Sequence, residues 1–340
     1  SRTVIVRKKD GNFRLCIDYR RLNAQTVKDV YPLPRIDDIL ASLSKARFFV
    51  ALDLLMGYHE VEVEPSDRVK TAFITHRGLF VWNVMPFGLT NAPATFQRLM
   101  NTVLVGLIGT GVLVYFNDVL IYAETVDELF SRLRQVLDRL RAAGLKCKPS
   151  KCQLCLKSVE YLGHIVGNGE LKPDPRKIEK VLQWPVPRDG SEVASFLGLC
   201  NYYRELIPGF AEIADCLYKS VQEEPFLWTP SKEAAFRRLQ QLVTSERVVK
   251  IPSTEAPFVL ETDASLNAVG ATLKQFFEPE GREFPVGFFS RALTGPERRY
   301  SVYEREMLAI LKACQHYRVF FLGRHFTVRT DHRAFRRIFS

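Results

Sequence analysis

Alternating apolar and polar residues predict paired strands near the start of the chain. Residues 3–7 and 12–18 alternate in this way around Lys9-Asp10-Gly11, a turn sequence suited to a hairpin. A second hairpin is predicted across residues 71–84, with its turn at Arg77-Gly78. The first part of the chain is therefore expected to contain short antiparallel ribbons.

Helical periodicity is found in three places. Pro32-Leu-Pro34 introduces a helix near residues 35–44. Asn91 is expected to cap a second helix, because an asparagine in this position accepts a hydrogen bond from a free backbone N–H group. The third helix carries leucines three and four residues apart over residues 129–140 and ends at Gly144.

Two apolar stretches between these helices predict buried strands. Residues 48–54 form the first strand, which carries Asp53 near its end. Residues 114–119 form a hairpin whose apolar run is interrupted by the adjacent polar residues Asn117 and Asp118. Both stretches therefore place a carboxylate at the end of an apolar strand.

The second half of the chain changes from helices to a sheet. Strands are predicted near residues 146–156 and 161–166, and residues 174–245 are mainly helical. After a linker at residues 252–257, three strands, a helix and one more strand are predicted at residues 258–263, 268–273, 286–290, 301–320 and 326–331. This order predicts an α/β sheet layer.

Length and charge bound the class of protein. At 340 residues the chain is long enough for two or three domains, and 46% hydrophobic with 25% charged residues is the composition of a folded protein. The net charge of +10 favours a polyanionic partner such as nucleic acid. No apolar run reaches the length needed to span a bilayer, so no membrane partner is expected.

The seven cysteines are scattered and odd in number, which argues against a disulfide framework. Cys147, Cys152 and Cys155, with His164 nearby, have the residue types of a zinc site. Their spacing lacks a second tight ligand pair, and buried thiols are the favoured interpretation.

Asp53 and Asp118 are candidate metal ligands. Phosphoryl transfer by two metal ions needs carboxylates that converge on ions roughly 3.5–4 Å apart. An acid at a strand end is also typical of a turn, and Asn117-Asp118 fits ordinary turn chemistry. Spacing alone leaves both interpretations open.

Five longer motifs distinguish between these interpretations. They are, in order, Val50-Ala-Leu-Asp-Leu-Leu-Met-Gly-Tyr-His59, Met85-Pro-Phe-Gly-Leu-Thr-Asn-Ala-Pro-Ala-Thr-Phe-Gln97, Tyr115-Phe-Asn-Asp-Val-Leu-Ile-Tyr122, Tyr161-Leu-Gly-His164 and Phe196-Leu-Gly-Leu-Cys-Asn-Tyr-Tyr-Arg204. Together they resemble the reverse transcriptase of gypsy-type long-terminal-repeat retrotransposons, which is similar to the retroviral enzymes. The resemblance covers nearly the whole chain.

The resemblance implies roles for the residues around the apolar hairpin. Asp53 matches the first catalytic aspartate, which bridges two magnesium ions, and Leu54 would offer its backbone carbonyl as a further ligand. Asn117 and Asp118 occupy the two positions that are normally a pair of catalytic aspartates. Tyr58 matches the aromatic residue that excludes a ribose 2′-hydroxyl, although by itself it also fits a core tyrosine after a glycine bend.

Further residues of the nucleotide site are implied in the same way. Phe87 and Gly88 match the segment that lines the incoming nucleotide. Arg14, with Lys8 or Lys9, resembles the cationic residues that hold the triphosphate. Read without the resemblance, Lys8 and Lys9 are more typical of a solvated hairpin tip.

The last part of the chain resembles ribonuclease H. The matching motifs are Thr262-Asp-Ala-Ser265, Tyr303-Glu-Arg-Glu-Met-Leu-Ala309 and Thr330-Asp-His332. Asp263, Glu306 and Asp331 would be the first three metal-binding acids, and two metals would activate water against the RNA strand of a hybrid. Glu304 competes with Glu306 but lies on a different face of the predicted helix.

The resemblance implies a right-hand polymerase of mixed α/β class followed by a ribonuclease H-like mixed sheet with a helix. Fingers and palm would span residues 1–170, and a helical thumb and connection 171–252. A C-terminally truncated ribonuclease H-like domain would span residues 253–340, because the family's fourth acid would lie beyond Ser340. Both ends of the chain are expected to be cut from a longer polypeptide.

The implied cofactor is Mg²⁺ at two-metal sites, with Mn²⁺ as a substitute. The implied partners are an RNA or DNA template-primer, an RNA–DNA hybrid and deoxynucleoside triphosphates, with a homodimer as a candidate assembly. Asn117 departs from the family because a neutral amide replaces a carboxylate, and polymerase activity is expected to fall by orders of magnitude. The alternative hypothesis is a catalytically dead, retroelement-derived protein that binds nucleic acid.

Overall fold

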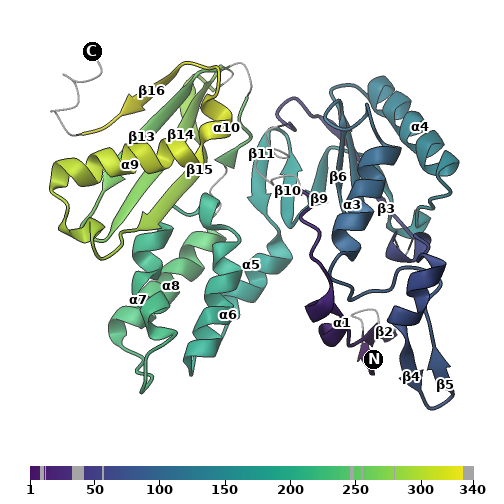
Figure 1. Cartoon of the computed structure of the whole chain (residues 1–340). Coiled ribbons are helices and arrows are strands. Elements are labelled where there is room, and N and C mark those ends of the chain that lie inside the picture. The colour runs from purple at the N-terminus through teal and green to yellow at the C-terminus, as the bar shows by residue number, and fades with distance from the viewer. Residues whose placement is uncertain are drawn as a thin grey trace. The chain divides into compact units, whose positions relative to one another are not determined.

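The computed structural model describes residues 1–7, 11, 13–32, 42–55, 57–245, 249–253, 256–278 and 280–331; at residue 14 only the backbone is described (Figure 1). The chain forms two compact units. The first consists of residues 1–42 and 46–159, and the second of residues 43–45 and 160–340. Within the described residues, no helix combines the length and apolarity that crossing a membrane requires.

A four-stranded antiparallel sheet forms the centre of the first unit. Its strand order is β6 (Val112–Tyr115), β7 (Asp118–Ala123), β3 (Phe48–Asp53) and β8 (Gln153–Leu156). Helices α3 (Ala92–Val103) and α4 (Val126–Ala142) pack against it through an apolar core. The core takes every second residue of β3, β6 and β7, so the residues between them on these strands point to the opposite face.

Two small antiparallel ribbons complete the first unit. β1 (Thr3–Arg7) pairs with β2 (Phe13–Ile17), and β4 (Phe73–Thr75) pairs with β5 (Gly78–Phe80), so both predicted hairpins are confirmed. The second turn lies at His76-Arg77, one residue before the predicted position. Short helices connect these elements: α1 (Arg20–Gln25), η1 (Gly57–Glu60), η2 (Pro65–Thr71) and η3 (Pro149–Lys151). The helix predicted near residues 35–44 falls mostly outside the described residues.

The predicted capping role of Asn91 is wrong in its chemistry. Asn91 precedes α3, but its side chain makes no cap hydrogen bond. Instead its Oδ1 accepts from the backbone N–H of Asp29 at 3.0 Å, and its Nδ2 donates to the carbonyl of Val27 at 2.9 Å. The side chain of Asn91 therefore forms its hydrogen bonds with the backbone of residues 27–29 and not with the first turn of α3.

The second unit begins with a sheet and a group of helices. The sheet has the order β12 (Val249–Lys250), β11 (Glu170–Pro173), β10 (His164–Gly167) and β9 (Ser158–Tyr161). The helices are α5 (Pro175–Leu182), α6 (Gly190–Asn201), η4 (Arg204–Leu206), α7 (Phe210–Ser220) and α8 (Pro230–Thr244), which confirms the helical region expected from the sequence. The rings of Phe196 and Phe236 meet in its interior, with centroids 4.5 Å apart.

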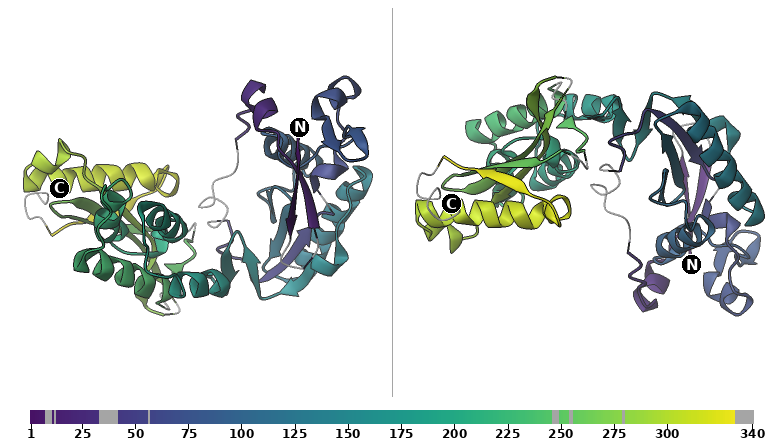
Figure 2. Two further views of the ribbon diagram at one scale, coloured as in Figure 1. Left: turned by 90° about the horizontal axis from the view of Figure 1, so that it is seen from below. Right: turned by 90° about the horizontal axis from the view of Figure 1, so that it is seen from above.

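A second four-stranded sheet follows. Its order is β15 (Arg282–Ala292), β14 (Ala268–Phe277), β13 (Phe258–Ala264) and β16 (Phe326–Arg329), in which only β13 and β16 are parallel. Helix α9 (Val302–His316), followed by α10 (Arg318–Phe321), packs on one face, and α7 lies on the other (Figure 2). The buried hydroxyl of Ser290 in β15 accepts the backbone N–H of Ala211 in α7 at 2.9 Å. The expected mixed sheet with a helix is therefore present.

The cysteines differ from the prediction of buried thiols. All seven are free, Cys147 and Cys152 are half-buried, and Cys155 is exposed. Cys155 has a positive φ of 53° in β8, a conformation that is uncommon for a residue other than glycine.

Candidate functional site

The carboxylates of Asp53 and Asp118 lie opposite each other across two paired strands. Asp53 ends β3 and Asp118 begins β7, and their Cα atoms are direct partners in the antiparallel register. Both point to the face away from the α3–α4 core, because their neighbours Leu52 and Val119 belong to that core. Like charges directly opposite each other are unfavourable unless a cation lies between or beside them.

Lys151 provides one such cation. Its Nζ lies 2.8 Å from Oδ2 of Asp53. Sequence reasoning missed this lysine, because it lies ninety-eight residues from Asp53 and comes close to it only in the folded chain.

A buried glutamine holds the tip of the β6–β7 hairpin. Gln97 of α3 is only 1% exposed, and its Oε1 accepts the backbone N–H of Phe116 at 2.9 Å. Its Nε2 donates to the carbonyl of Val114 at 3.2 Å and to Oδ1 of Asn101 at 3.0 Å. Phe116 itself has a φ of +53°, a left-handed conformation that needs such support in a residue other than glycine. Sequence reasoning missed this role, although a polar residue on an apolar helix face was the available signal.

Replacing Gln97 with leucine is expected to lower the free energy of unfolding by about 1–3 kcal/mol, because the partly buried N–H of Phe116 would lose its acceptor. Urea unfolding followed by circular dichroism measures the change. Gln135→Leu, at an exposed position of α4, is the matched control and should change stability by less than about 0.5 kcal/mol. Equal losses in the two variants would contradict the assigned role.

The side chain of Asn117 is packed against the backbone of Gly57. A Cβ atom at position 57 would lie 2.3 Å from Oδ1 of Asn117, so this approach requires glycine. Oδ1 is buried and has no hydrogen-bond partner among the described residues. Buried polar atoms are normally paired, so this oxygen has an unused capacity to accept a hydrogen bond or to bind a cation. Oxygen atoms of carboxylate and amide groups are the ligand type that Mg²⁺ takes, and in this respect the tip fits such an ion.

Aromatic residues surround the next part of the site. Tyr58 in η1 is half-buried, its ring centroid lies 5.4 Å from that of Phe87 and 5.6 Å from that of Phe96, and burial raises the pKa of its phenol. Gly88 has a φ of +98°, and a Cβ there would lie 3.3 Å from the carbonyl oxygen of Ile17. Leu54 is buried beside these residues in the core.

The predicted triphosphate contacts fall where the structure gives no side chains. Lys8 and Lys9 lie outside the described residues, and the side chain of Arg14 is also outside them. Their predicted role stays a prediction.

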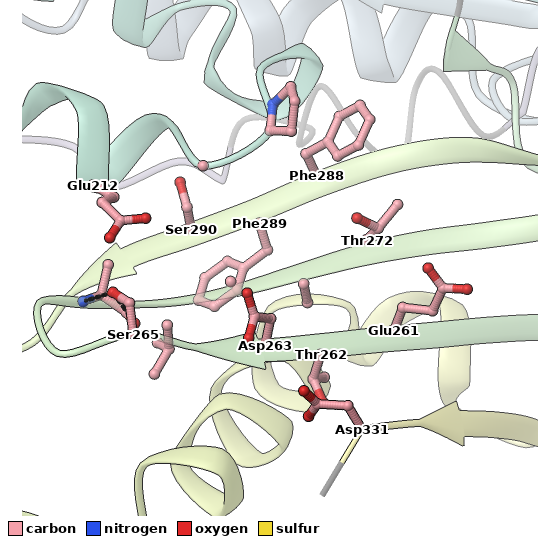
Figure 3. Close-up of a pocket in the computed structure, with 16 residues that line it drawn as sticks. Glu212, Glu261, Thr262, Asp263, Ser265, Thr272, Phe288, Phe289, Ser290 and Asp331 are labelled. Carbon is pink, nitrogen blue, oxygen red and sulfur yellow. Dashed lines mark hydrogen bonds between the residues drawn. The ribbon is translucent and has the colours of Figure 1, made fainter. Parts of the chain in front are cut away.

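A second group of acids lines a pocket of about 420 Å³ in the second unit. Asp263, at the end of β13, and Asp331, just after β16, both line it (Figure 3). Glu261 pairs with Arg329 in the parallel register, so counting two residues further along each strand brings Asp263 level with Asp331. The other wall includes Glu212 of α7, which sequence reasoning missed because nothing local indicates that α7 covers this sheet.

The two competing glutamates of α9 have different surroundings. Glu304 forms a capping box with Ser301: its carboxylate accepts the Ser301 backbone N–H at 2.8 Å, and its own N–H donates to the Ser301 hydroxyl at 3.3 Å. Glu306 is 4% exposed and does not line the pocket. Its neighbour Arg305 donates to the carbonyl of Ser265 at 2.8 Å, which ties α9 to the turn that follows Asp263.

In the part of the chain that the structure describes, no three His, Cys, Asp or Glu side chains gather as a metal-binding group. At the first site two acids are accompanied by the amide Asn117, and at the second the pocket joins Asp263 and Asp331 without Glu306. The predicted metal ligands are thus brought together in pairs.

Two family models match the chain. Residues 6–166 match the family described as reverse transcriptase (RNA-dependent DNA polymerase), and residues 228–328 match the RNase H-like domain found in reverse transcriptase. The families with these domains generally use divalent metal ions.

Curated relatives agree with these matches. The retrovirus-related Pol polyprotein from transposon 297 of Drosophila melanogaster is 38% identical over 98% of this chain and 31% of its own length. The corresponding polyprotein from the gypsy transposon of the same fly is 39% identical over 94% of this chain and 32% of its own length. The chain spans about a third of the length of these relatives.

Solved structures show the same fold. The foamy viral protease-reverse transcriptase dRH in complex with double-stranded DNA matches with a TM-score of 0.87 at 24% identity, over 98% of this chain and 58% of its own. The foamy viral protease-reverse transcriptase in complex with an RNA/DNA hybrid matches with a TM-score of 0.81 at 24% identity, over 96% of this chain and 44% of its own. The chain belongs to the reverse transcriptase family of retrovirus-related Pol polyproteins, with a reverse transcriptase domain followed by a ribonuclease H-like domain.

Proposed function

We propose that this chain is the polymerase and ribonuclease H segment of a gypsy-type Pol polyprotein, and that its first unit transfers nucleotides to a primer 3′-hydroxyl. The observation that carries the proposal is the direct opposition of Asp53 and Asp118 on one face of the reverse transcriptase sheet. Opposed carboxylates at strand ends are what two-metal phosphoryl transfer requires.

Asp53 and Asp118 would hold divalent ions, Mg²⁺ with Mn²⁺ as a substitute, together with the backbone carbonyl of Leu54. When bound, the ions would supply charge neutralisation for the attacking and leaving oxygens. Gln97 keeps Asp118 in register with Asp53 by holding the hairpin tip. Asn117 offers only a neutral oxygen, which weakens the site for cations.

The residues beside the carboxylates would bind the nucleotide. The ring of Tyr58 packs against the ring of Phe87. This contact supports a role for Tyr58, Phe87 and Gly88 in lining the side of the site that would face the sugar of the nucleotide. Arg14 and Lys8 would contact the triphosphate of an incoming deoxynucleotide.

The second unit would degrade the RNA of a hybrid. Asp263 and Asp331 open into one pocket, which supports a metal-assisted hydrolysis at this position, and Glu306 would complete the acid set from α9. We assign fingers and palm to residues 1–170, thumb and connection to 171–252, and the ribonuclease H-like domain to 253–340.

Nucleic acid is the proposed partner. The net charge of +10 suits a polyanion, and related folds have been solved with double-stranded DNA and with an RNA/DNA hybrid. Contacts are expected mainly to phosphate and sugar, because a copying enzyme must accept every template sequence.

Primer extension on an RNA template, with Mg²⁺ or Mn²⁺, tests the proposal. The chain is expected to extend the primer slowly, and Asp53→Asn should remove that extension, because it takes away one of the two opposed charges. Asp138→Asn, at an exposed position of α4, is the matched control and should retain primer extension. Extension that is unaffected by Asp53→Asn would refute the proposed site.

A second candidate function is favoured by Asn117 alone: a protein that binds nucleic acid without turnover. It predicts salt-dependent binding of an RNA–DNA hybrid together with no extension, both by this chain and by its Asn117→Asp variant.

A further inference from the structure

The lysine at the first site is held in place by its backbone. Lys151 ends the short helix η3, and its N–H donates to the carbonyl of Lys148 at 2.9 Å. The N–H of Lys148 donates in turn to the carbonyl of Asp53 at 2.8 Å. The same backbone that is fastened to Asp53 therefore delivers the ammonium group of Lys151 to its carboxylate.

This arrangement differs from an ordinary surface ion pair. A pair between two mobile side chains contributes little, because ordering both of them costs entropy. Here the turn is anchored a second time, since the N–H of Leu55 donates to the carbonyl of Lys146 at 2.7 Å. The side chain of Asp53 is 28% exposed, so its charge is only partly screened by water, while that of Lys151 is 56% exposed.

The ammonium group and a metal ion would compete for the same oxygen. Nζ of Lys151 lies 2.8 Å from Oδ2 of Asp53, a distance that leaves no room for a cation between them. The opposed carboxylate of Asp118 adds a like charge, which makes some cation at this place favourable.

We propose that Lys151 is a built-in counter-ion of the Asp53–Asp118 site, which occupies the cation position on Asp53 and has to move away before a divalent ion can bind there. This inference rests on the proposed function, because it assumes that Asp53 and Asp118 bind metal. Lys151 thereby raises the metal concentration that the site requires and stabilises the metal-free protein.

Mn²⁺ binding, measured on the full chain by the loss of the free Mn²⁺ electron paramagnetic resonance signal, tests the proposal. The parent carries Asp263→Asn and Asp331→Asn, so that the second pocket does not contribute. Lys151→Met keeps the length of the side chain and removes its charge, and it is expected to bind Mn²⁺ about two- to fivefold more tightly.

Two variants separate local pairing from general charge. Lys148→Met removes an exposed lysine of the same turn and should leave Mn²⁺ affinity within about 1.5-fold of the parent. Lys151→Arg keeps the pairing charge and should also stay near the parent value. Circular dichroism of each variant shows whether it is folded.

The possible outcomes distinguish the counter-ion role of Lys151 from the proposed metal binding by Asp53 and Asp118. Binding that is weakened by Asp53→Asn but unchanged or weakened by Lys151→Met would overturn the counter-ion and leave the metal site standing. If Asp53→Asn leaves the affinity for Mn²⁺ unchanged, both the metal site and the counter-ion role of Lys151 would be overturned. An equal gain from Lys148→Met and Lys151→Met would also overturn the proposal, because net charge alone would explain it.

Discussion

Replacing Asn117 with aspartate is expected to raise the rate of primer extension by at least about a hundredfold. A correctly held metal ion contributes several kcal/mol to phosphoryl transfer, and each 1.4 kcal/mol or so is worth a factor of about ten in rate. The amide at position 117 lies at the tip of the hairpin that carries Asp118, where the resemblance described above implies a second carboxylate. We therefore expect the missing charge at position 117 to limit primer extension.

The packing around Asn117 favours this substitution. Aspartate has nearly the same shape as asparagine, so it fits against the backbone of Gly57 without a new clash. Oδ1 of Asn117, which lacks a hydrogen-bond partner within the described part of the chain, would become part of a carboxylate and a stronger ligand for a divalent ion. The gain should thus come from charge and not from a change in fold.

Initial rates on a primed RNA template with saturating Mg²⁺ measure this effect. Asn168→Asp is the matched control, because it adds the same charge in an exposed turn of the second unit and should leave the rate unchanged. The double variant Asn117→Asp with Asp53→Asn should again be inactive. Equal rates for the parent chain and Asn117→Asp would contradict this account of position 117.

Glu306→Gln is expected to lower cleavage of the RNA in a hybrid by at least about a hundredfold, whereas Glu304→Gln should leave cleavage nearly unchanged. Glu306 is buried in α9, where a loss of charge cannot be replaced by solvent. Glu304 acts on the helix end, and glutamine can also close a capping box. Both variants replace a glutamate of α9 with glutamine, at positions two residues apart, so each serves as the control for the other.

Cleavage of a labelled RNA strand in an RNA–DNA hybrid, with Mg²⁺ present, measures the difference. Primer extension by both variants in the Asn117→Asp background should stay at the level of that background, because the polymerase carboxylates lie in the other unit. Similar losses of cleavage in Glu304→Gln and Glu306→Gln would show that helix stability, and not a specific acid, limits the reaction.

Local patterns predicted most of the elements of this fold and few of its contacts. The apolar run before Asp53 predicted β3, and the run around Asn117 predicted the β6–β7 hairpin, because both strands are buried. The register that sets Asp53 opposite Asp118 was not predictable, since it depends on pairing between strands far apart in the sequence. The error at Asn91 has the same origin, because its partners lie more than sixty residues away.

In the candidate site, too, the residue types were predictable from the sequence and their contacts were not. The family motifs predicted which acids are candidates, but the residues that position or neutralise them were found only in three dimensions. Gln97 acts on a turn nineteen residues away, and Lys151 acts on a carboxylate ninety-eight residues away. Such roles depend on which elements become neighbours, and a single sequence does not contain that information in its local pattern.

The parallel pairing of β13 with β16 has a consequence for how the chain folds. Both strands lie in the second unit, but α9 and two other strands separate them in the sequence. Until residues 326–329 have been synthesised, β13 presents unpaired N–H and C=O groups along one edge. Long-range parallel contacts of this kind close late and slowly, because the intervening chain must first be ordered. The nascent second unit should consequently depend on protection from aggregation until β16 has been synthesised and has paired with β13.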